Sequence, residues 1–218
     1  MDTLTTVVDI FLHLDEHLAA VLERYGTLTY ALLFVIVYVE TGLVVMPLLP
    51  GDSLLFAAGA LASSTGQLDV RLIIVLLMAA ALLGDNTNYF IGRFFGRYIK
   101  ARERVLFLKR EYIEKTEAFY KKYGGRTVVM ARFIPIVRTV APFVAGAGSM
   151  EYKRYIIYCL TGALLWVGGI TLLGFWFGNI PVVKNNFELV IISIILVSVL
   201  PMVVGFIKGR AGAARSGR

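Results

Sequence analysis

Residues 132–138 read Arg-Phe-Ile-Pro-Ile-Val-Arg, and they lie near the middle of an otherwise apolar stretch, residues 128–148. On insertion scales, an arginine at the centre of a lone membrane helix costs about 2.5 to 3.5 kcal/mol. Pro135, between the two arginines, removes a backbone donor and interrupts a helix. The stretch therefore predicts a broken helix, which a bilayer tolerates only where protein or water satisfies the freed backbone groups.

A second apolar stretch, residues 28–62, is interrupted in the same way. Pro47, Pro50 and Gly51 come shortly before Asp52, and Glu40 lies upstream of them. Both stretches are long enough to enter a bilayer and return, and neither has the uniform apolar character of a single spanning helix.

The composition assigns the whole chain to a membrane. Of its 218 residues, 58% are hydrophobic and 17% are charged, and the mean hydropathy is +0.74. Soluble domains have roughly 45–50% apolar and about 25% charged residues, so a sizeable extramembrane domain is excluded. The single cysteine, Cys159, excludes a disulfide framework and a cysteine-based zinc site, and His13 and His17 have no evident third ligand. No metal or cofactor is expected.

Basic residues near the segment ends predict which side of the membrane each loop occupies. Residues 93–126 contain eleven Lys or Arg against four acids, and the tail after Ile207 has four basic residues and no acid. Both are predicted to be cytoplasmic, and nucleic acid is not expected as a partner. The stretch from Tyr98 to Tyr123 is expected to rest on anionic lipids of the cytoplasmic leaflet, with a solvated connector as the alternative. Counting back from the cytoplasmic tail, two spans return the chain to the cytoplasmic side near residue 153. Residues 127–149 therefore have to enter and leave on the cytoplasmic side. One further span, at 70–96, places residues 28–62 on the other side, where they also have to enter and leave.

The predicted fold is an all-α polytopic membrane protein with a single domain, residues 1–218. Two opposed re-entrant helical hairpins in inverted repeats combine with three transmembrane helices and amphipathic interfacial helices. Residues 56–60 (FAAGA) resemble residues 143–147 (FVAGA), although chance similarity of glycine-rich apolar sequence is the alternative. The predicted segments are an interfacial helix at 1–25, hairpins at 28–62 and 127–149, spans at 70–96, 153–178 and 187–208, a cytoplasmic amphipathic segment at 98–124 and a basic cytoplasmic tail at 209–218.

Five charged side chains fall at membrane depth in this layout: Glu40, Asp52, Asp85, Arg132 and Arg138. Unpaired, they would cost roughly 12 to 17 kcal/mol, which rivals the stability of a typical fold, about 5 to 15 kcal/mol. They are therefore expected to gather in one polar, partly hydrated chamber. The arginines suit a phosphate and the acids suit protons, with Asp85 orienting the arginines. The alternative is a scaffold in which ion pairs only lock the hairpins together.

Known enzymatic motifs are missing from the sequence. The chain has no Gly-x-x-x-x-Gly-Lys loop, no Gly-x-Ser-x-Gly elbow and no metal-binding helix signature, so an enzyme is not expected. A membrane phosphatase is the remaining enzymatic alternative, and it lacks a histidine or cysteine nucleophile near the arginines. The glycine pairs 92/96 and 174/178 favour close helix packing within the chain, and a homo-oligomer is left open.

The charged residues belong to motifs that resemble those of the DedA family, the SNARE-associated or VTT-domain proteins of the bacterial inner membrane. The first half carries ETG at residues 40–42, PLLPGDS at 47–53, and Gly84-Asp85 followed by YFIGR at 89–93. The second half carries RFIPIVRT at 132–139, followed by Pro142 and Ala145-Gly146. The resemblance covers nearly the whole chain.

This resemblance implies a multi-pass inner-membrane protein that moves lipids between leaflets. It maps proton-coupling acids onto Glu40 and Asp52, and phosphate-binding arginines onto Arg132 and Arg138. The residues expected to support them are Pro47, Pro50, Gly51, Ser53, Asp85, Pro135, Thr139 and Pro142. The implied substrate is undecaprenyl phosphate, returned to the cytoplasmic leaflet with proton coupling. The alternatives are a flippase or scramblase of phosphatidylethanolamine or of phospholipids in general, and a proton-coupled drug or ion transporter.

Overall fold

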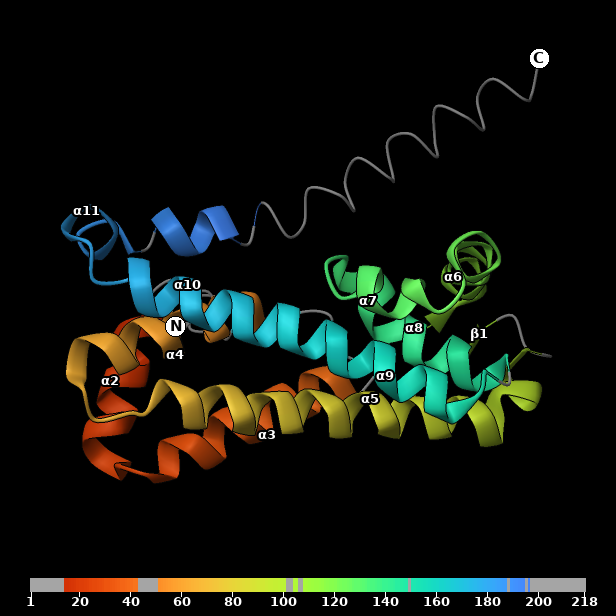
Figure 1. Ribbon diagram of the computed structural model, residues 1–218, viewed down its shortest axis with the longest axis horizontal. Coiled ribbons are helices and arrows are strands. Elements are labelled where there is room, and N and C mark those ends of the chain that lie inside the picture. The colour runs from red at the N-terminus through yellow and green to blue at the C-terminus, as the bar shows by residue number, and fades with distance from the viewer. Residues whose placement is uncertain are drawn as a thin grey trace, which may run out of the picture.

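The structure is a computed structural model that describes residues 14–42, 51–100, 104–105, 108–148, 150–187, 189–194 and 196. Nearly all regular structure in these ranges is helical (Figure 1). The exceptions within them are β1, Arg104–Val105, and β2, Leu108–Lys109, which pair antiparallel as a two-residue ribbon. The helical class predicted from the sequence is confirmed.

The helices fall into two series along the chain. The first series is α2 (Leu14–Tyr25), α3 (Leu28–Gly42), α4 (Gly51–Thr65) and the long α5 (Val70–Lys100). The second is α6 (Arg110–Tyr123), α7 (Arg126–Ala131), α8 (Pro135–Ala147), α9 (Tyr152–Ala163), α10 (Gly169–Phe177) and α11 (Pro181–Lys184). A π-helical turn, η1 (Leu164–Gly168), joins α9 to α10, so that residues 152–177 form one helix.

Two helices in the described ranges are long and apolar enough to cross a membrane by length and composition: residues 70–95 and 152–177, with 26 residues each. A span needs about 20 apolar residues. The two helices run antiparallel along the long axis of the molecule (Figure 1), and the Tyr155 hydroxyl donates a 2.8 Å hydrogen bond to the Asp85 carbonyl. Most of the third predicted span, 187–208, lies outside the described residues. Residues 1–13, Pro47, Pro50 and the tail at 209–218 lie entirely outside them.

Helices α3 and α4 form a pair that begins and ends at one end of the molecule. Each has 15 residues, about 22 Å of helix, against a hydrocarbon core of about 30 Å. At the start of α3, the Tyr30 hydroxyl accepts the Asp69 backbone N–H at 2.8 Å, beside the start of α5. At the end of α4, Asn179 donates to Ser63 at 2.8 Å. At the other ends of the two helices, Gly51 at the start of α4 packs against Glu40 near the end of α3.

Helices α7 and α8 form a second pair, which approaches from the other end of the long axis (Figure 1). Gly125, just before α7, packs against Tyr158 of α9, and Gly146, near the end of α8, packs against the backbone of α5. Pro135 lies in the first turn of α8, where its missing N–H removes no helical hydrogen bond. Re-entry of either pair into a bilayer stays a prediction.

The two pairs pack on the long helices through equivalent glycine contacts. A side chain at any of four glycines would collide with a carbonyl oxygen of the facing helix: Gly59 with Thr171, Gly174 with Phe56, Gly146 with Tyr89, and Gly92 with Phe143. The first two contacts join α4 to α10, and the last two join α8 to α5. The repeated sequences at 56–60 and 143–147 therefore occupy corresponding contacts, and these glycines pack within the chain.

The segment predicted as a cytoplasmic amphipathic element, 98–124, is not one continuous helix. Residues 98–100 extend α5, the β1–β2 ribbon follows, and α6 alone forms a separate helix. Helix α6 is anchored on α8 because the Tyr120 hydroxyl donates to the Ala141 carbonyl at 3.0 Å.

Candidate functional site

The five charged residues singled out in the sequence meet at the centre of the molecule. They come from the end of α3, the start of α4, the middle of α5, the turn after α7 and the first turn of α8, in the order Glu40, Asp52, Asp85, Arg132 and Arg138. The interruptions of the two apolar stretches place helix ends at this point, since Gly51 begins α4 and Pro135 begins α8. These helix ends carry charged groups into the interior.

Arg138 joins the two broken stretches. Its Nη2 pairs with Oε1 of Glu40, and its Nη1 lies 3.1 Å from Oδ1 of Asp52. The Glu40 and Arg138 side chains are 1% and 8% exposed, and the Asp52 side chain is 18% exposed. One guanidinium therefore holds two carboxylates, one from each side of the break between α3 and α4.

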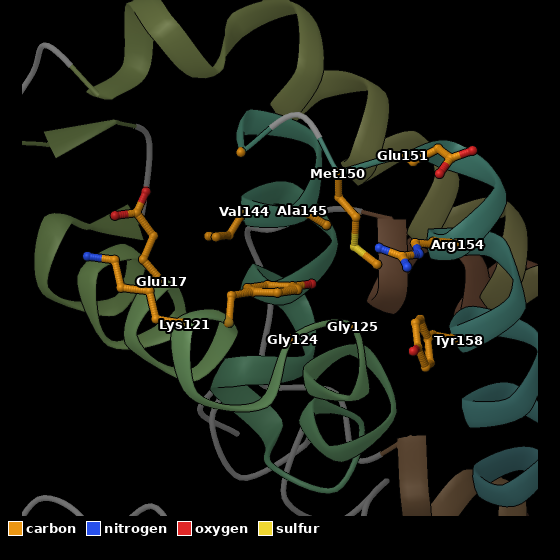
Figure 2. A pocket seen from close by; sticks show the side chains of 12 residues that line it. Glu117, Lys121, Gly124, Gly125, Val144, Ala145, Met150, Glu151, Arg154 and Tyr158 are labelled. Atoms are coloured by element: carbon orange, nitrogen blue, oxygen red, sulfur yellow. The ribbon is translucent and has the colours of Figure 1, made fainter.

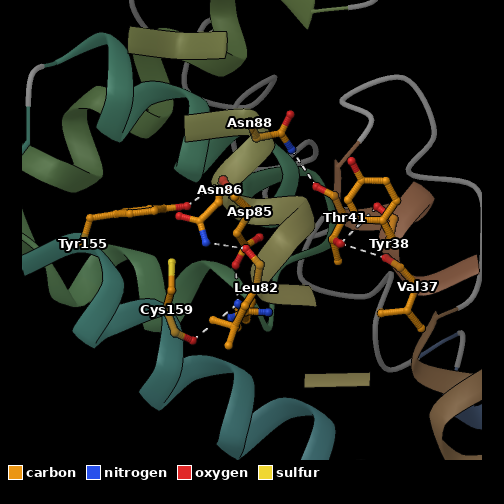
Figure 3. A network of polar contacts seen from close by, with 10 residues as sticks. Val37, Tyr38, Thr41, Leu82, Asp85, Asn86, Asn88, Tyr155 and Cys159 are labelled. Carbon is orange, nitrogen blue, oxygen red and sulfur yellow. Dashed lines mark hydrogen bonds and ion pairs between the residues drawn. The ribbon is translucent and has the colours of Figure 1, made fainter. Parts of the chain in front are cut away.

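Arg132 pairs with a different acid, Asp85 of α5, through Nη2 and Oδ2. Nη2 of Arg132 also lies 3.4 Å from the Cys159 carbonyl oxygen. Gly162 gives this side chain its space, because a Cβ there would lie 2.8 Å from Cδ and Nε of Arg132. Figure 3 shows Asp85 with Tyr155 and Cys159 on one side and the end of α3 on the other.

Trp166 links the two arginines, and sequence reasoning missed it. Its indole N–H donates to Oδ1 of Asp52 at 2.7 Å, and its ring centroid lies 4.8 Å from the guanidinium carbon of Arg138 and 5.9 Å from that of Arg132. Both distances are within the range of cation–π attraction. The only signal in the sequence was an indole N–H inside an uncharged apolar span, since a buried indole usually finds a hydrogen-bond acceptor.

Asn88 is a second residue that sequence reasoning missed. Its side-chain amide donates to the Thr41 carbonyl at 2.6 Å, which ties α5 to the end of α3 one residue after Glu40 (Figure 3). Beside this contact, the Thr41 hydroxyl donates to the Val37 carbonyl at 2.7 Å, and Gly84 packs against Thr41 because it has no side chain. The end of α3 is therefore held in a defined position relative to Asp85.

Two buried donors of the site have no hydrogen-bond partner within the described part of the chain: Nε of Arg132 and Nε of Arg138. Leaving a buried donor unpaired costs about 1 to 3 kcal/mol, and more when the group is charged. Three carboxylates accompany the two guanidiniums, so the cluster has one acid in excess. The arrangement can therefore donate hydrogen bonds to an anionic oxygen, and its acids compete with that oxygen for the arginines.

The supporting residues named from the sequence lie around this cluster where the structure describes them. Gly51 packs directly against the Glu40 carboxylate, a contact that a Cβ would block. Ser53 and Thr139 are buried next to Asp52 and Arg138 in the chain, and Pro142 lies inside α8. Pro47 and Pro50 fall outside the described residues. Among the described residues, no group of three His, Cys, Asp or Glu side chains could hold a metal ion.

A pocket of about 540 Å³ lies apart from the charged cluster, where α6, the end of α8 and the start of α9 meet. Figure 2 shows Glu117 and Lys121 at its α6 side and Arg154 and Tyr158 at its α9 side. None of the five clustered residues lines it. This pocket opens at the end of the molecule from which α7 and α8 approach the centre.

Comparisons with known proteins assign the family. The family model described as the VTT domain matches residues 49–176, a range that contains Asp52, Asp85, both arginines of the cluster and Trp166 but not Glu40. Protein DedA of Escherichia coli (strain K12) is 49% identical over the full length of both chains.

Two other relatives are named as membrane proteins. The inner membrane protein YqjA of Escherichia coli (strain K12) is 31% identical over 94% of this chain and 92% of its own. The uncharacterized membrane protein Rv0364 of Mycobacterium tuberculosis (strain H37Rv) is 39% identical over 83% of this chain and 79% of its own. No solved structure matches. A domain match over more than half of the chain and a full-length relative at 49% identity show that this membrane protein belongs to the DedA family of VTT-domain proteins.

Proposed function

We propose that this protein moves a phosphorylated lipid between the leaflets of the bacterial inner membrane, with undecaprenyl phosphate as the first candidate substrate. The observation that carries the proposal is the pair of buried arginines, each with an Nε–H donor that meets no acceptor among the described residues. Guanidinium groups bind phosphate oxygens through paired, charge-assisted hydrogen bonds. A lipid could present its headgroup to this site while its chain remains in the bilayer.

The depth of the site supports a role in crossing. Asp85 and Trp166 lie near the middle of the two 26-residue apolar helices, so the charged cluster would lie near the bilayer midplane. Ionisable groups at that depth are costly and commonly mark pathways for ions or substrates. Helices α3 and α4, and helices α7 and α8, would form opposed re-entrant pairs around this point, as in transporters built from inverted repeats.

Coupling to protons follows from the competition within the cluster. Nε of Arg138 offers one donor, and a phosphate that binds Arg138 through paired hydrogen bonds also has to replace Glu40 at Nη2 or Asp52 at Nη1. A protonated carboxyl loses its charge and releases the arginine, so proton entry and phosphate binding favour each other. Release of the phosphate, together with loss of the proton to water on the same side, then lets the carboxylate return to Arg138.

Purified protein in vesicles provides the test. Labelled undecaprenyl phosphate and labelled phosphatidylethanolamine would be followed across the bilayer, with and without a pH gradient. Arg138→Gln is expected to abolish movement, whereas Arg154→Gln, an exposed arginine outside the cluster, serves as the matched control.

Three outcomes would replace the proposal by a different function. Equal, gradient-independent movement of both lipids would indicate a scramblase. Release of inorganic phosphate would indicate a phosphatase. Unchanged movement in Arg138→Gln would leave the cluster with a structural role only.

A further inference from the structure

Asp52 is surrounded by groups that stabilise its charged form. It lies in the first turn of α4, where the positive end of the helix dipole favours an anion. Its Oδ1 accepts hydrogen bonds from Trp166 at 2.7 Å and from Arg138 at 3.1 Å. Its side chain also keeps 18% of its surface exposed. The helix dipole, the two hydrogen-bond donors and the partial exposure all favour the charged carboxylate.

Glu40 is more deeply buried than Asp52, although it contacts the same arginine and also lies against Gly51 at the start of α4. It is third from the end of α3, and the negative end of a helix dipole disfavours an anion. The side chain is 1% exposed, and its Oε2 meets no donor at hydrogen-bonding geometry among the described residues. Arg138 is the one guanidinium with which it pairs in that part of the chain. Burial is the largest influence on this carboxyl group and favours its neutral form, whereas Arg138 and the Gly51 backbone N–H act in the other direction.

The other charged groups around Glu40 do not reverse this difference. Helix α8 contributes Arg138, which pairs with Glu40, and α4 contributes Asp52, which contacts the same guanidinium. The nearby acid of α5 is Asp85, which pairs with Arg132. Helix α2 also packs on α3 and carries these exposed charged residues: Glu16, His17, Glu23 and Arg24. Arg138 thus holds two carboxylates with one positive charge, and a single proton removes the excess.

We infer that Trp166 holds Asp52 in its contact with Arg138, which leaves the more deeply buried Glu40 as the group that binds and releases the proton. The inference deepens the proton-coupling part of the proposed function and rests on it. When Glu40 takes a proton, Nη2 of Arg138 loses its charged partner and becomes available to an anionic oxygen. Asp52, kept in place by the indole N–H, continues to orient the same guanidinium through Nη1. Trp166 is a positioning residue in this scheme.

Infrared spectroscopy of the full-length protein in lipid bilayers tests the assignment without any substrate. A carboxyl group absorbs at a distinct frequency when protonated, and exchange into heavy water identifies the band. A buried protonated carboxyl is expected to titrate in the wild type between neutral and mildly acidic pH. Glu40→Gln should eliminate this band, and Asp52→Asn should retain it and move its titration to lower pH, because one negative charge has been removed. A band that persists in Glu40→Gln, or that is absent from Asp52→Asn throughout this range, would overturn the assignment.

The role of Trp166 has its own test, which stays informative if Glu40→Gln fails to fold. Trp166→Phe keeps an aromatic ring over Arg138 and removes the donor to Asp52, so the absorption band of the Asp52 carboxylate should shift in frequency, and Asp52→Asn in the same chain should remove the shifted band. Trp176→Phe is the matched control, since Trp176 lies on the same helix and is 63% exposed. Identical spectra for the two tryptophan variants would refute the role of Trp166. Because no lipid moves in this experiment, its failure is distinct from failure of the vesicle assay.

Discussion

Replacing Asp85 by leucine removes the partner of a buried arginine. The Arg132 and Asp85 side chains are 4% and 7% exposed, so water cannot substitute for the lost carboxylate. The remaining contact of Nη2, with the Cys159 carbonyl, is long at 3.4 Å. Removing one member of a buried ion pair destabilises a protein by about 3 to 5 kcal/mol, because the other charge stays buried without a partner. At about 1.4 kcal/mol per tenfold change, the unfolding equilibrium constant should rise by roughly 10² to 10⁴.

The assay is reversible unfolding in mixed micelles, followed by circular dichroism. The double variant Asp85→Leu with Arg132→Met should recover most of the loss, since apolar replacement of a whole buried pair is often neutral or stabilising. Glu151→Gln is the matched control, because this exposed acid should change the free energy of unfolding by less than about 0.5 kcal/mol. A single variant as stable as the control, or a double variant as unstable as the single one, would refute the reasoning. The stable double variant should also fail to move lipid, and retained movement would show that Arg132 does not bind the headgroup.

Three further predictions concern the packing around the site. Gly174→Ala should lower the free energy of unfolding by about 1 to 3 kcal/mol, because the added Cβ would collide with the facing backbone. Gly169→Ala should raise it by about 0.5 to 1 kcal/mol, because a Cβ there meets no other atom. Thermal unfolding of the two variants measures both effects. With Trp176 replaced by Phe, the emission of Trp166 should be insensitive to aqueous iodide and to lipid-phase quenchers, and strong quenching by either would contradict its burial. Tyr155→Phe removes a hydrogen bond to a backbone carbonyl and should lower the free energy of unfolding by about 0.5 to 1.5 kcal/mol, and an unchanged value in the same micelle titration would count against this contact.

The spans and their interruptions could be predicted because local physics decides them. Long, mostly apolar runs form helices in a bilayer, and the predicted segments 70–96 and 153–178 match the apolar helical stretches 70–95 and 152–177 within a residue. Pro135 and Gly51 lie at the predicted interruptions, and α8 and α4 begin at these two residues. Neither result depends on what the segment contacts.

The pairing of the charges could not be predicted from the sequence. The cost of lone charges at membrane depth indicates that the five residues meet, and it left open which acid contacts which arginine. In the structure, Glu40 and Asp52 both contact Arg138, and Asp85 contacts Arg132. The FAAGA and FVAGA repeat likewise indicated similar halves, and it did not indicate that α4 packs on α10 while α8 packs on α5.

The sequence by itself therefore determined a helical membrane protein with two broken apolar stretches and a charged cluster at their breaks. Hydrophobic length, missing backbone donors and the cost of burying charge all act along the chain, so they can be evaluated residue by residue. Only the tertiary structure decided the partners, since Asp85, Asp52 and Glu40 are 47, 86 and 98 residues from their arginines, and Trp166 is 114 residues from Asp52. Contacts over such separations are set by how helices cross, and here the helices cross in close backbone contact at glycines.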